Sequence, residues 1–239
     1  MTTICEPRIR AALALACTAL VLACTAPSDG GPIDDAPNQA PVEFICADRD
    51  ADEHDAFIDC VESFAPAPGD VTFGHDRLPT VLLGPPKGGG TLGGTDVVSL
   101  GCGGEITLYF AGEGILDGPG DDFIVFENPF ALGEGSFVEP ARVLVSDDGE
   151  RWREFPCDLD ARPPLGCAGI ELVHATDAAD ALNPEIAGGD AFDLAQVGLE
   201  QARWVRLIDV TREYYGHDMW CAGEAGGFDL DALASRHAT

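Results

Sequence analysis

The sequence is poor in positive charge. Of its 239 residues, 13 are Lys or Arg and 42 are Asp or Glu, which gives a formal net charge of −29 at pH 7. Lys87 is the only lysine in the sequence. Proteins that bind nucleic acids need clustered cationic side chains to neutralise the phosphates. The composition therefore argues against a nucleic acid as a partner.

The sequence also lacks the short motifs of common enzyme classes. It contains no G-x-S-x-G elbow, no H-E-x-x-H and no G-x-x-x-x-G-K-[ST]. Residues 88–93 match G-x-G-x-x-G as a string, but the residues after them, 95–100, have the composition of a strand. The dinucleotide fingerprint requires a helix at that point. We therefore expect residues 88–93 to form a loop and the protein to lack catalytic activity.

The apolar run near the N-terminus is too short to span a bilayer. Residues 11–23 follow Arg8 and Arg10 and form a 13-residue apolar segment, whereas a spanning helix needs roughly 20 residues. This order of charge and hydrophobicity is typical of a signal peptide. The segment ends in Val21-Leu22-Ala23-Cys24, which resembles the bacterial lipobox. The resemblance implies cleavage before Cys24 and attachment of lipid to it; a plain secretory signal or cleavage at Cys17 are the alternatives.

The next segment is rich in Pro, Asp, Ser, Gly and Ala and has almost no large apolar side chain. Such a composition buries too little surface to become ordered. We therefore predict a signal peptide at 1–23, a flexible, disordered tether at 24–41 and one domain at 42–239, whose residues 42–70 form an N-terminal lead-in. We expect an exported protein that is anchored to a membrane by lipid. Because Thr rather than Asp follows Cys24, the outer membrane or cell surface is favoured.

The nine cysteines predict disulfide bonds. Two leave with the signal peptide and Cys24 takes lipid, so six remain in the domain. An even number of cysteines in an exported chain indicates three disulfides, although their pairing is open. The simplest pairing closes two short loops and leaves one long one: Cys46–Cys60, Cys157–Cys167 and Cys102–Cys221. A zinc site is disfavoured because the sequence has no C-x2-C or H-x3-H spacing.

The domain reads mainly as short strands. Runs of branched and aromatic residues, each bounded by Gly, Asp or Pro, predict strands at 97–100, 105–110, 123–126, 142–146, 151–155, 203–208 and 227–232. Asp147-Asp148-Gly149 predicts a hairpin between the fourth and fifth of these. Residues 54–64 have apolar side chains at helical spacing and predict a short helix. The expected fold is therefore all-β, an antiparallel β-sandwich with a short helical lead-in.

Two segments of the sequence resemble the galactose-binding-like (discoidin-type) jelly-roll domains: 143–152, with its Ser-x-Asp-Gly turn and Trp, and 202–207. Four more are similar to an uncharacterised family of bacterial cell-surface lipoproteins: 97–110, 117–130, 188–194 and 227–233. The resemblance spans roughly residues 70–235. It implies a jelly-roll sandwich at the cell surface. Discoidin-type relatives bind glycans, lipids or proteins through variable loops, and some hold a structural calcium ion.

Acidic residues gather near glycines and at the ends of the predicted strands. Six of them are candidate ligands for a Ca²⁺ ion, which accepts carboxylate and carbonyl oxygens: Asp121, Asp122, Glu127, Asp190, Asp229 and Asp231. The alternative is that they form solvated edges that discourage aggregation between strands. No EF-hand spacing is present.

Aromatic residues are concentrated between the last two predicted strands. Tyr214, Tyr215 and Trp220 lie in a predicted loop, where exposed rings can stack on sugars; packing beside Cys221 is the competing role. The sequence thus favours a non-catalytic surface protein that presents loops to a glycan or protein ligand. Two alternatives are a calcium-dependent hydrolase of glycans or esters and a purely structural envelope lipoprotein.

Overall fold

The computed structural model describes residues 41–44, 46, 55–133, 135–183 and 185–237. The predicted signal peptide (1–23), Cys24 and the tether as far as residue 40 lie outside the described residues. Among the helices of the described part, none has the length and hydrophobicity needed to cross a membrane.

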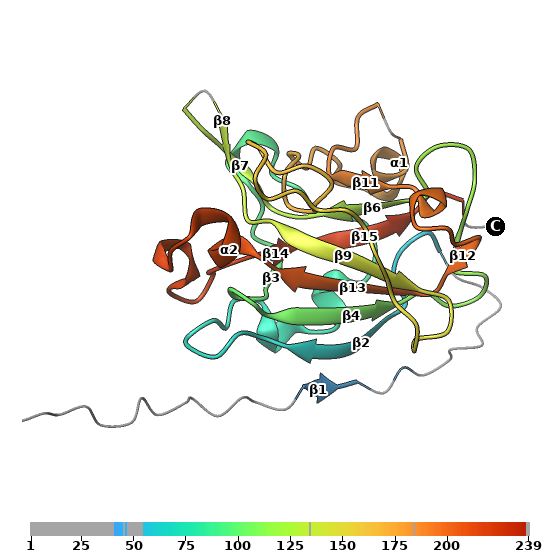
Figure 1. The fold of residues 1–239 in the computed structure, drawn as a ribbon, viewed down its shortest axis with the longest axis horizontal. Helices are drawn as coiled ribbons and strands as arrows, with labels where there is room; N and C mark the ends of the chain where they lie inside the picture. The colour runs from blue at the N-terminus through green and yellow to red at the C-terminus, as the bar shows by residue number, and fades with distance from the viewer. Residues whose placement is uncertain (1–40, 45, 47–54, 134, 184, 238–239) are drawn as a thin grey trace, which may run out of the picture. The chain divides into compact units, whose positions relative to one another are not determined.

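The largest sheet is antiparallel and has six strands (Figure 1). In spatial order these are β1 (Val42–Glu43), β2 (Cys60–Ala65), β4 (Glu105–Tyr109), β13 (Trp204–Asp209), β9 (Ala141–Ser146) and β10 (Arg153–Glu154). A three-stranded antiparallel sheet contains β11 (Asp190–Phe192), β6 (Phe123–Phe126) and β15 (Ala232–Ser235). The prediction of a mainly β, antiparallel domain is confirmed.

Three antiparallel strand pairs complete the β structure of the described residues. They are β5 (Ile115–Leu116) with β12 (Gln201–Ala202), β3 (Val98–Ser99) with β14 (Asp229–Leu230), and β7 (Phe130–Leu132) with β8 (Gly135–Phe137). The helices are α1 (Ala178–Ala181) and α2 (Thr211–Tyr215), and the 3-10 turns are η1 (His75–Arg77), η2 (Thr80–Leu82), η3 (Gly90–Leu92), η4 (Leu194–Gln196) and η5 (Met219–Cys221).

One hydrophobic core joins the two larger sheets. On β13, Val205 and Leu207 are buried while their neighbours along the strand are half-buried, as the alternation of side chains in a strand requires. These residues pack in the same cluster as Phe123 and Val125 of β6 and Leu233 of β15. All four residues of β6 are buried. The sheets therefore stabilise each other through the apolar faces that the sequence pattern indicates.

The predicted helix at 54–64 is wrong for its described residues. Cys60–Ala65 forms strand β2, which pairs with β4 and β1. The register against β4 shifts between Val61 and Ser63, which is a β-bulge. A bulge adds one residue, so Val61 and Phe64 both point into the core although they are three residues apart. This spacing is also that of a helix face, so the sequence pattern alone indicates a helix at this point.

The hairpin predicted at Asp147-Asp148-Gly149 is present between β9 and β10. The Asp148 carboxylate accepts hydrogen bonds from the main-chain N–H groups of Glu150 and Arg151 and pairs with the Arg151 side chain. These donors lower the pKa of Asp148 far below its usual range. The turn thus carries its own hydrogen-bond acceptor.

The three disulfide bonds have the predicted pairing. Cys46–Cys60 and Cys157–Cys167 close short loops, with sequence separations of 14 and 10. Cys102–Cys221 joins residues 119 apart. This last bond links the segment before β4 to η5, and it therefore constrains most of the domain.

Candidate functional site

A pocket of about 630 Å³ opens beside β8 and α2. It is lined by Gly135, Ser136, Val138, Pro163, Ile170, Glu171, Leu172, His174, Glu185, Ile186, Gly188 and Tyr214. Its volume lies within the range of pockets that hold small ligands. The pocket is therefore a candidate for a ligand-binding site.

The lining of this pocket combines apolar surface with uncharged and acidic hydrogen-bonding groups. Tyr214 contributes an aromatic ring, Ser136 a hydroxyl and His174 an imidazole, while Glu171 and Glu185 are exposed carboxylates. Among the described residues that line it, none is Lys or Arg. The carboxylates of the lining suit a neutral ligand with many hydroxyl groups, because carboxylate and backbone carbonyl oxygens accept hydrogen bonds from hydroxyl groups.

A buried carboxylate holds one wall of the pocket in place. Asp190, on β11, accepts hydrogen bonds from the N–H groups of Gly169, Ile170 and Glu171 at 2.7, 3.0 and 3.3 Å. Gly169 has a φ of 86°, and a Cβ atom there would lie 2.3 Å from the carbonyl oxygen of Glu139. Only glycine is tolerated in this position. Burial raises the pKa of Asp190 to about 7, in spite of its three donors.

The structure brings the three predicted aromatic residues together. The ring of Tyr215 lies 4.7 Å from that of Tyr214 and 6.1 Å from that of Trp220, and its hydroxyl donates to the carbonyl oxygen of Val138 at 3.0 Å. Only Tyr214 lines the pocket, and the guanidinium of Arg162 lies over its ring at 4.5 Å. Tyr214 is thus the member of the three that lines the pocket, where it is half-buried, while Trp220 is 37% exposed but lies outside the pocket lining.

Phe137 is the partner that sequence reasoning missed. It lies on β8, and its ring is 4.8 Å from Trp220, 6.1 Å from Tyr215 and 4.9 Å from Phe130 of β7. These contacts join the β7–β8 hairpin to α2 and η5. No local pattern connects residues about 80 positions apart, so the sequence held no signal for this cluster.

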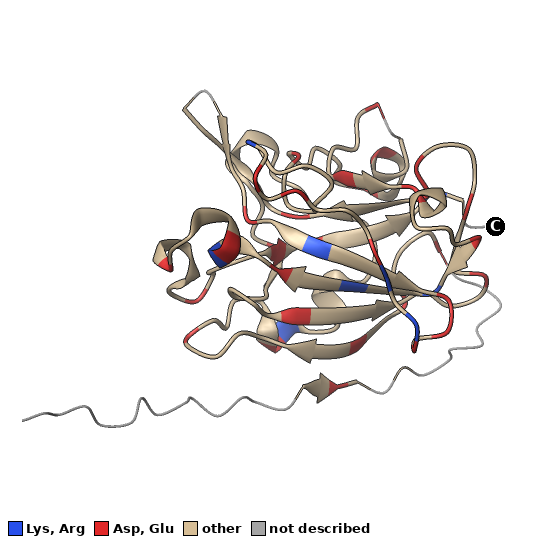
Figure 2. Ribbon diagram, in the orientation of Figure 1, with Lys and Arg blue, Asp and Glu red and all other residues tan. Residues whose placement is uncertain are grey.

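The six predicted calcium ligands do not form one site. Asp and Glu residues are spread over many of the loops that surround the strands (Figure 2). Asp121 is exposed and forms an ion pair with Arg236 at 3.6 Å. Asp190 is held by three main-chain donors near the pocket. The remaining four belong to three different places in the fold.

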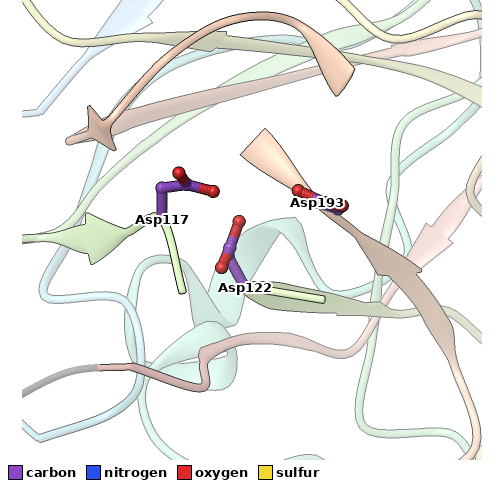
Figure 3. A group of neighbouring side chains, drawn as sticks. All are labelled: Asp117, Asp122 and Asp193. Atoms are coloured by element: carbon purple, nitrogen blue, oxygen red, sulfur yellow. The ribbon is translucent and has the colours of Figure 1, made fainter. Parts of the chain in front are cut away.

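Asp122 lies beside two other aspartates. Carboxylate oxygens of Asp117, Asp122 and Asp193 all lie within 4.8 Å of one another (Figure 3). Both oxygens of Asp122 already accept main-chain N–H groups, one from Gly118 at 2.8 Å and one from Leu194 at 2.7 Å. We name Asp117, Asp122 and Asp193 the aspartate trio. Its central member has a structural role because it ties the start of β6 to η4.

Asp231 binds the glycine-rich loop. Its carboxylate accepts hydrogen bonds from the N–H groups of Lys87 and Gly88 at 2.9 to 3.1 Å. Residues 90–92 of this loop form η3, and the strand β3 rather than a helix follows. The prediction that residues 88–93 form a loop is therefore confirmed. The N–H groups of Lys87 and Gly88, at the start of this loop, donate to a carboxylate of the same chain. Burial raises the pKa of Asp231 to about 6.

Glu127 and Asp229 lie together in the interior with two acidic residues that the sequence did not single out. The exposed fraction is 2% for Glu127, 7% for Asp229, 8% for Glu139 and 2% for Asp209. Asp209 is well satisfied, because it accepts from the N–H groups of Gly103, Thr211 and Phe228 and from the Thr211 hydroxyl. Burial and the charges of the other three raise the pKa of Glu139 to about 11.

The chain matches no family model, and no curated protein is significantly similar to it. The residues of the chain and the geometry of its sites therefore carry the functional conclusion.

Proposed function

We propose that the protein is an exported, lipid-anchored envelope protein whose β domain binds a neutral glycan without catalysis. The pocket beside Tyr214 is the proposed binding site. Its size, the aromatic ring of Tyr214 in its lining and its set of hydroxyl, imidazole and carboxylate groups support this proposal. The C–H face of a sugar ring is apolar and packs on an aromatic ring, while its hydroxyl groups donate to carboxylate and carbonyl oxygens.

We further propose that the domain is a galactose-binding-like jelly-roll sandwich. The two segments that carry this resemblance, 143–152 and 202–207, become β9 with its turn and β12 with β13. The strands β9 and β13 are hydrogen-bonded neighbours in the six-stranded sheet. The shared core of the two larger sheets also supports a sandwich. This architecture leaves the loops free to bind ligands.

The binding site is tested by measuring glycan binding of the purified protein on a glycan array and then by calorimetry. We expect Tyr214→Ala to weaken the binding of a neutral glycan at least tenfold, because the ring that packs on the sugar is lost. Phe130→Ala is the matched control: Phe130 is a neighbouring aromatic residue outside the pocket lining, and this variant should keep its affinity. Melting curves of both variants establish that they are folded.

Two results would contradict this proposal in different ways. If no glycan binds, or if Tyr214→Ala binds as well as the wild type, the pocket is not a glycan site and a structural envelope role is favoured. If the protein cleaves a glycan or an ester, the hydrolase alternative is favoured. Glu171 and Glu185 are then the first residues to substitute, because they are the carboxylates of the pocket lining.

The lipid anchor has its own test in the host cell. We expect the wild-type protein to incorporate labelled palmitate and to sediment with the envelope, because Cys24 takes lipid. Cys24→Ser should abolish both properties, while Cys17→Ser should leave them unchanged. Labelling of the Cys24→Ser variant would show that the predicted cleavage site is wrong.

A further inference from the structure

Arg162 contacts a residue of the pocket lining from a distant part of the chain. The carbon at the centre of its guanidinium group (Cζ) lies 4.5 Å from the centroid of the Tyr214 ring. A cation over the face of an aromatic ring is attracted by the electrons of the ring. The next residue, Pro163, lines the same pocket as Tyr214. The contact therefore joins two walls of the pocket.

The main chain holds the guanidinium group of Arg162 in place. Its Nη1 atom donates hydrogen bonds to the carbonyl oxygens of Leu159 and Ala161 at 2.5 and 2.7 Å. The side chain is exposed, and an exposed arginine normally samples many rotamers. Two hydrogen bonds from one end of a planar, rigid group restrict these rotamers. The cation is thus fixed before any ligand arrives.

The loop that carries this arginine is itself constrained. The Cys157–Cys167 disulfide closes it, and beside the disulfide Asp158 and Leu165 exchange both main-chain hydrogen bonds, at 2.9 and 3.1 Å. The disulfide belongs to an apolar cluster on which Tyr214 also packs. The loop therefore gives the aromatic ring a rigid support.

Arg162 differs from most arginines of this acidic protein in having no carboxylate partner. Most arginines that the structure describes form an ion pair with Asp or Glu, but among the described residues no such pair includes Arg162. Its partners are two carbonyl oxygens and the ring of Tyr214. The geometry thus directs this cation to the ring.

We infer that Arg162 is a positioning residue, which holds the ring of Tyr214 in the orientation that a sugar needs. This inference rests on the proposed function of the pocket. A ring that is already held in place loses less conformational entropy when a sugar packs on it, so the affinity rises by preorganisation. Arg162 thereby acts on the ligand through Tyr214 and not by direct contact.

Calorimetry tests the inference with the neutral glycan that gives the strongest signal on the array. Arg162→Ala should weaken binding about two- to fivefold, the range that an exposed cation–π contact provides. Arg162→Lys keeps the charge and should lie between this variant and the wild type. When Tyr214→Ala is already present, Arg162→Ala should have no further effect. Arg153→Ala is the matched control, because Arg153 is an exposed arginine of β10 outside the pocket lining.

A second measurement needs no glycan. The sequence has three tyrosines, so protein labelled with ring-¹³C tyrosine gives three sets of ring signals in NMR spectra. The set that disappears in Tyr214→Ala belongs to Tyr214. It should shift in Arg162→Ala and stay in place in Arg153→Ala. The signals of Tyr109, whose ring contacts Trp204 instead, should not move.

Failure of the inference and failure of the proposed function give different results. If the wild type binds no glycan, the proposed function is wrong, and the signals of Tyr214 decide whether Arg162 positions the ring. If the glycan binds but Arg162→Ala keeps the wild-type affinity or leaves those signals unshifted, the inference is wrong. An equal loss of affinity with and without Tyr214→Ala would mean that Arg162 contacts the glycan directly, which also contradicts a positioning role.

Melting curves show whether each variant is folded. Should Arg162→Ala not fold, Arg162→Gln takes its place, because it keeps an amide donor for the carbonyl oxygens and removes only the charge. The same loss of affinity and the same shift of the Tyr214 signals are expected from it, and their absence would overturn the inference.

Discussion

Aspartate side chains in this protein serve mainly as acceptors for main-chain N–H groups. Asp122, Asp190, Asp209 and Asp231 each accept two or more such bonds, at least one of them from a segment that is distant in sequence. A charge-assisted hydrogen bond is stronger than a neutral one, and a buried N–H group needs a partner. These aspartates therefore stabilise the fold. The pattern of acidic residues in the sequence is equally compatible with metal ligands, so it does not distinguish the two roles.

The buried carboxyl group of Asp190 should make the unfolding free energy depend on pH. Its pKa is about 7 in the folded protein and about 3.9 in the unfolded chain, so the folded state binds its proton more tightly. The stability gained from this proton is complete below about pH 4 and is lost as the pH rises to about 7. In chelator, the difference in unfolding free energy between pH 5 and pH 8 should be roughly 2 to 3 kcal/mol smaller in Asp190→Asn than in the wild type.

Urea unfolding at the two pH values measures this difference. Asp121→Asn is the control, because its side chain is 47% exposed, and it should show the wild-type dependence on pH. If Asp190→Asn and the wild type lose the same free energy between pH 5 and pH 8, Asp190 does not titrate in this range.

At the scale of elements, loops are fixed to strands by single side chains. Asp231 holds the glycine-rich loop before η3 to the start of β15. The exposed fraction of this residue is 4%. The β7–β8 hairpin is held to α2 and η5 by the ring of Phe137. Each of these contacts joins segments that the sequence shows only as separate loops.

Asp231→Ala tests the first of these contacts. Removal of the carboxylate leaves the N–H groups of Lys87 and Gly88 without their acceptor, and we expect a loss of about 1 to 3 kcal/mol in unfolding free energy. Asp231→Asn keeps an acceptor oxygen and should lose less. Equal losses in the two variants, measured by chemical denaturation, would mean that the hydrogen bonds are not the source of the stability.

At the scale of the whole molecule, the disulfide between Cys102 and Cys221 closes by far the longest of the three loops. Loop entropy in the unfolded chain grows with loop length, so this bond should stabilise the protein by about 2 kcal/mol more than Cys157–Cys167 does. Replacing each pair by alanines and comparing the unfolding free energies checks this. A larger loss from the Cys157–Cys167 pair would mean that native packing, and not loop length, decides the effect.

The sequence by itself indicated seven of the strand segments and the hairpin at 147–149, and it gave the observed pairing of the cysteines as the simplest of the open choices. These features depend on residues that are close together in the sequence. They are the alternation of apolar side chains, the Asp-Gly turn, and the short sequence separations within two of the three cysteine pairs. It misread β2, because a bulge gives a strand the apolar spacing of a helix turn. It also grouped acidic residues that belong to different sites.

Only the tertiary structure decided which of those residues meet. Glu139 joins Glu127 and Asp229 because the ends of three strands converge, and Phe137 reaches Trp220 because a hairpin packs against a helix. Such contacts depend on which strands pair over long sequence separations. The spacing of residues along the chain does not predict this pairing. The same holds for the pocket beside Tyr214, whose walls come from β8, residues 163–174 and residues 185–188.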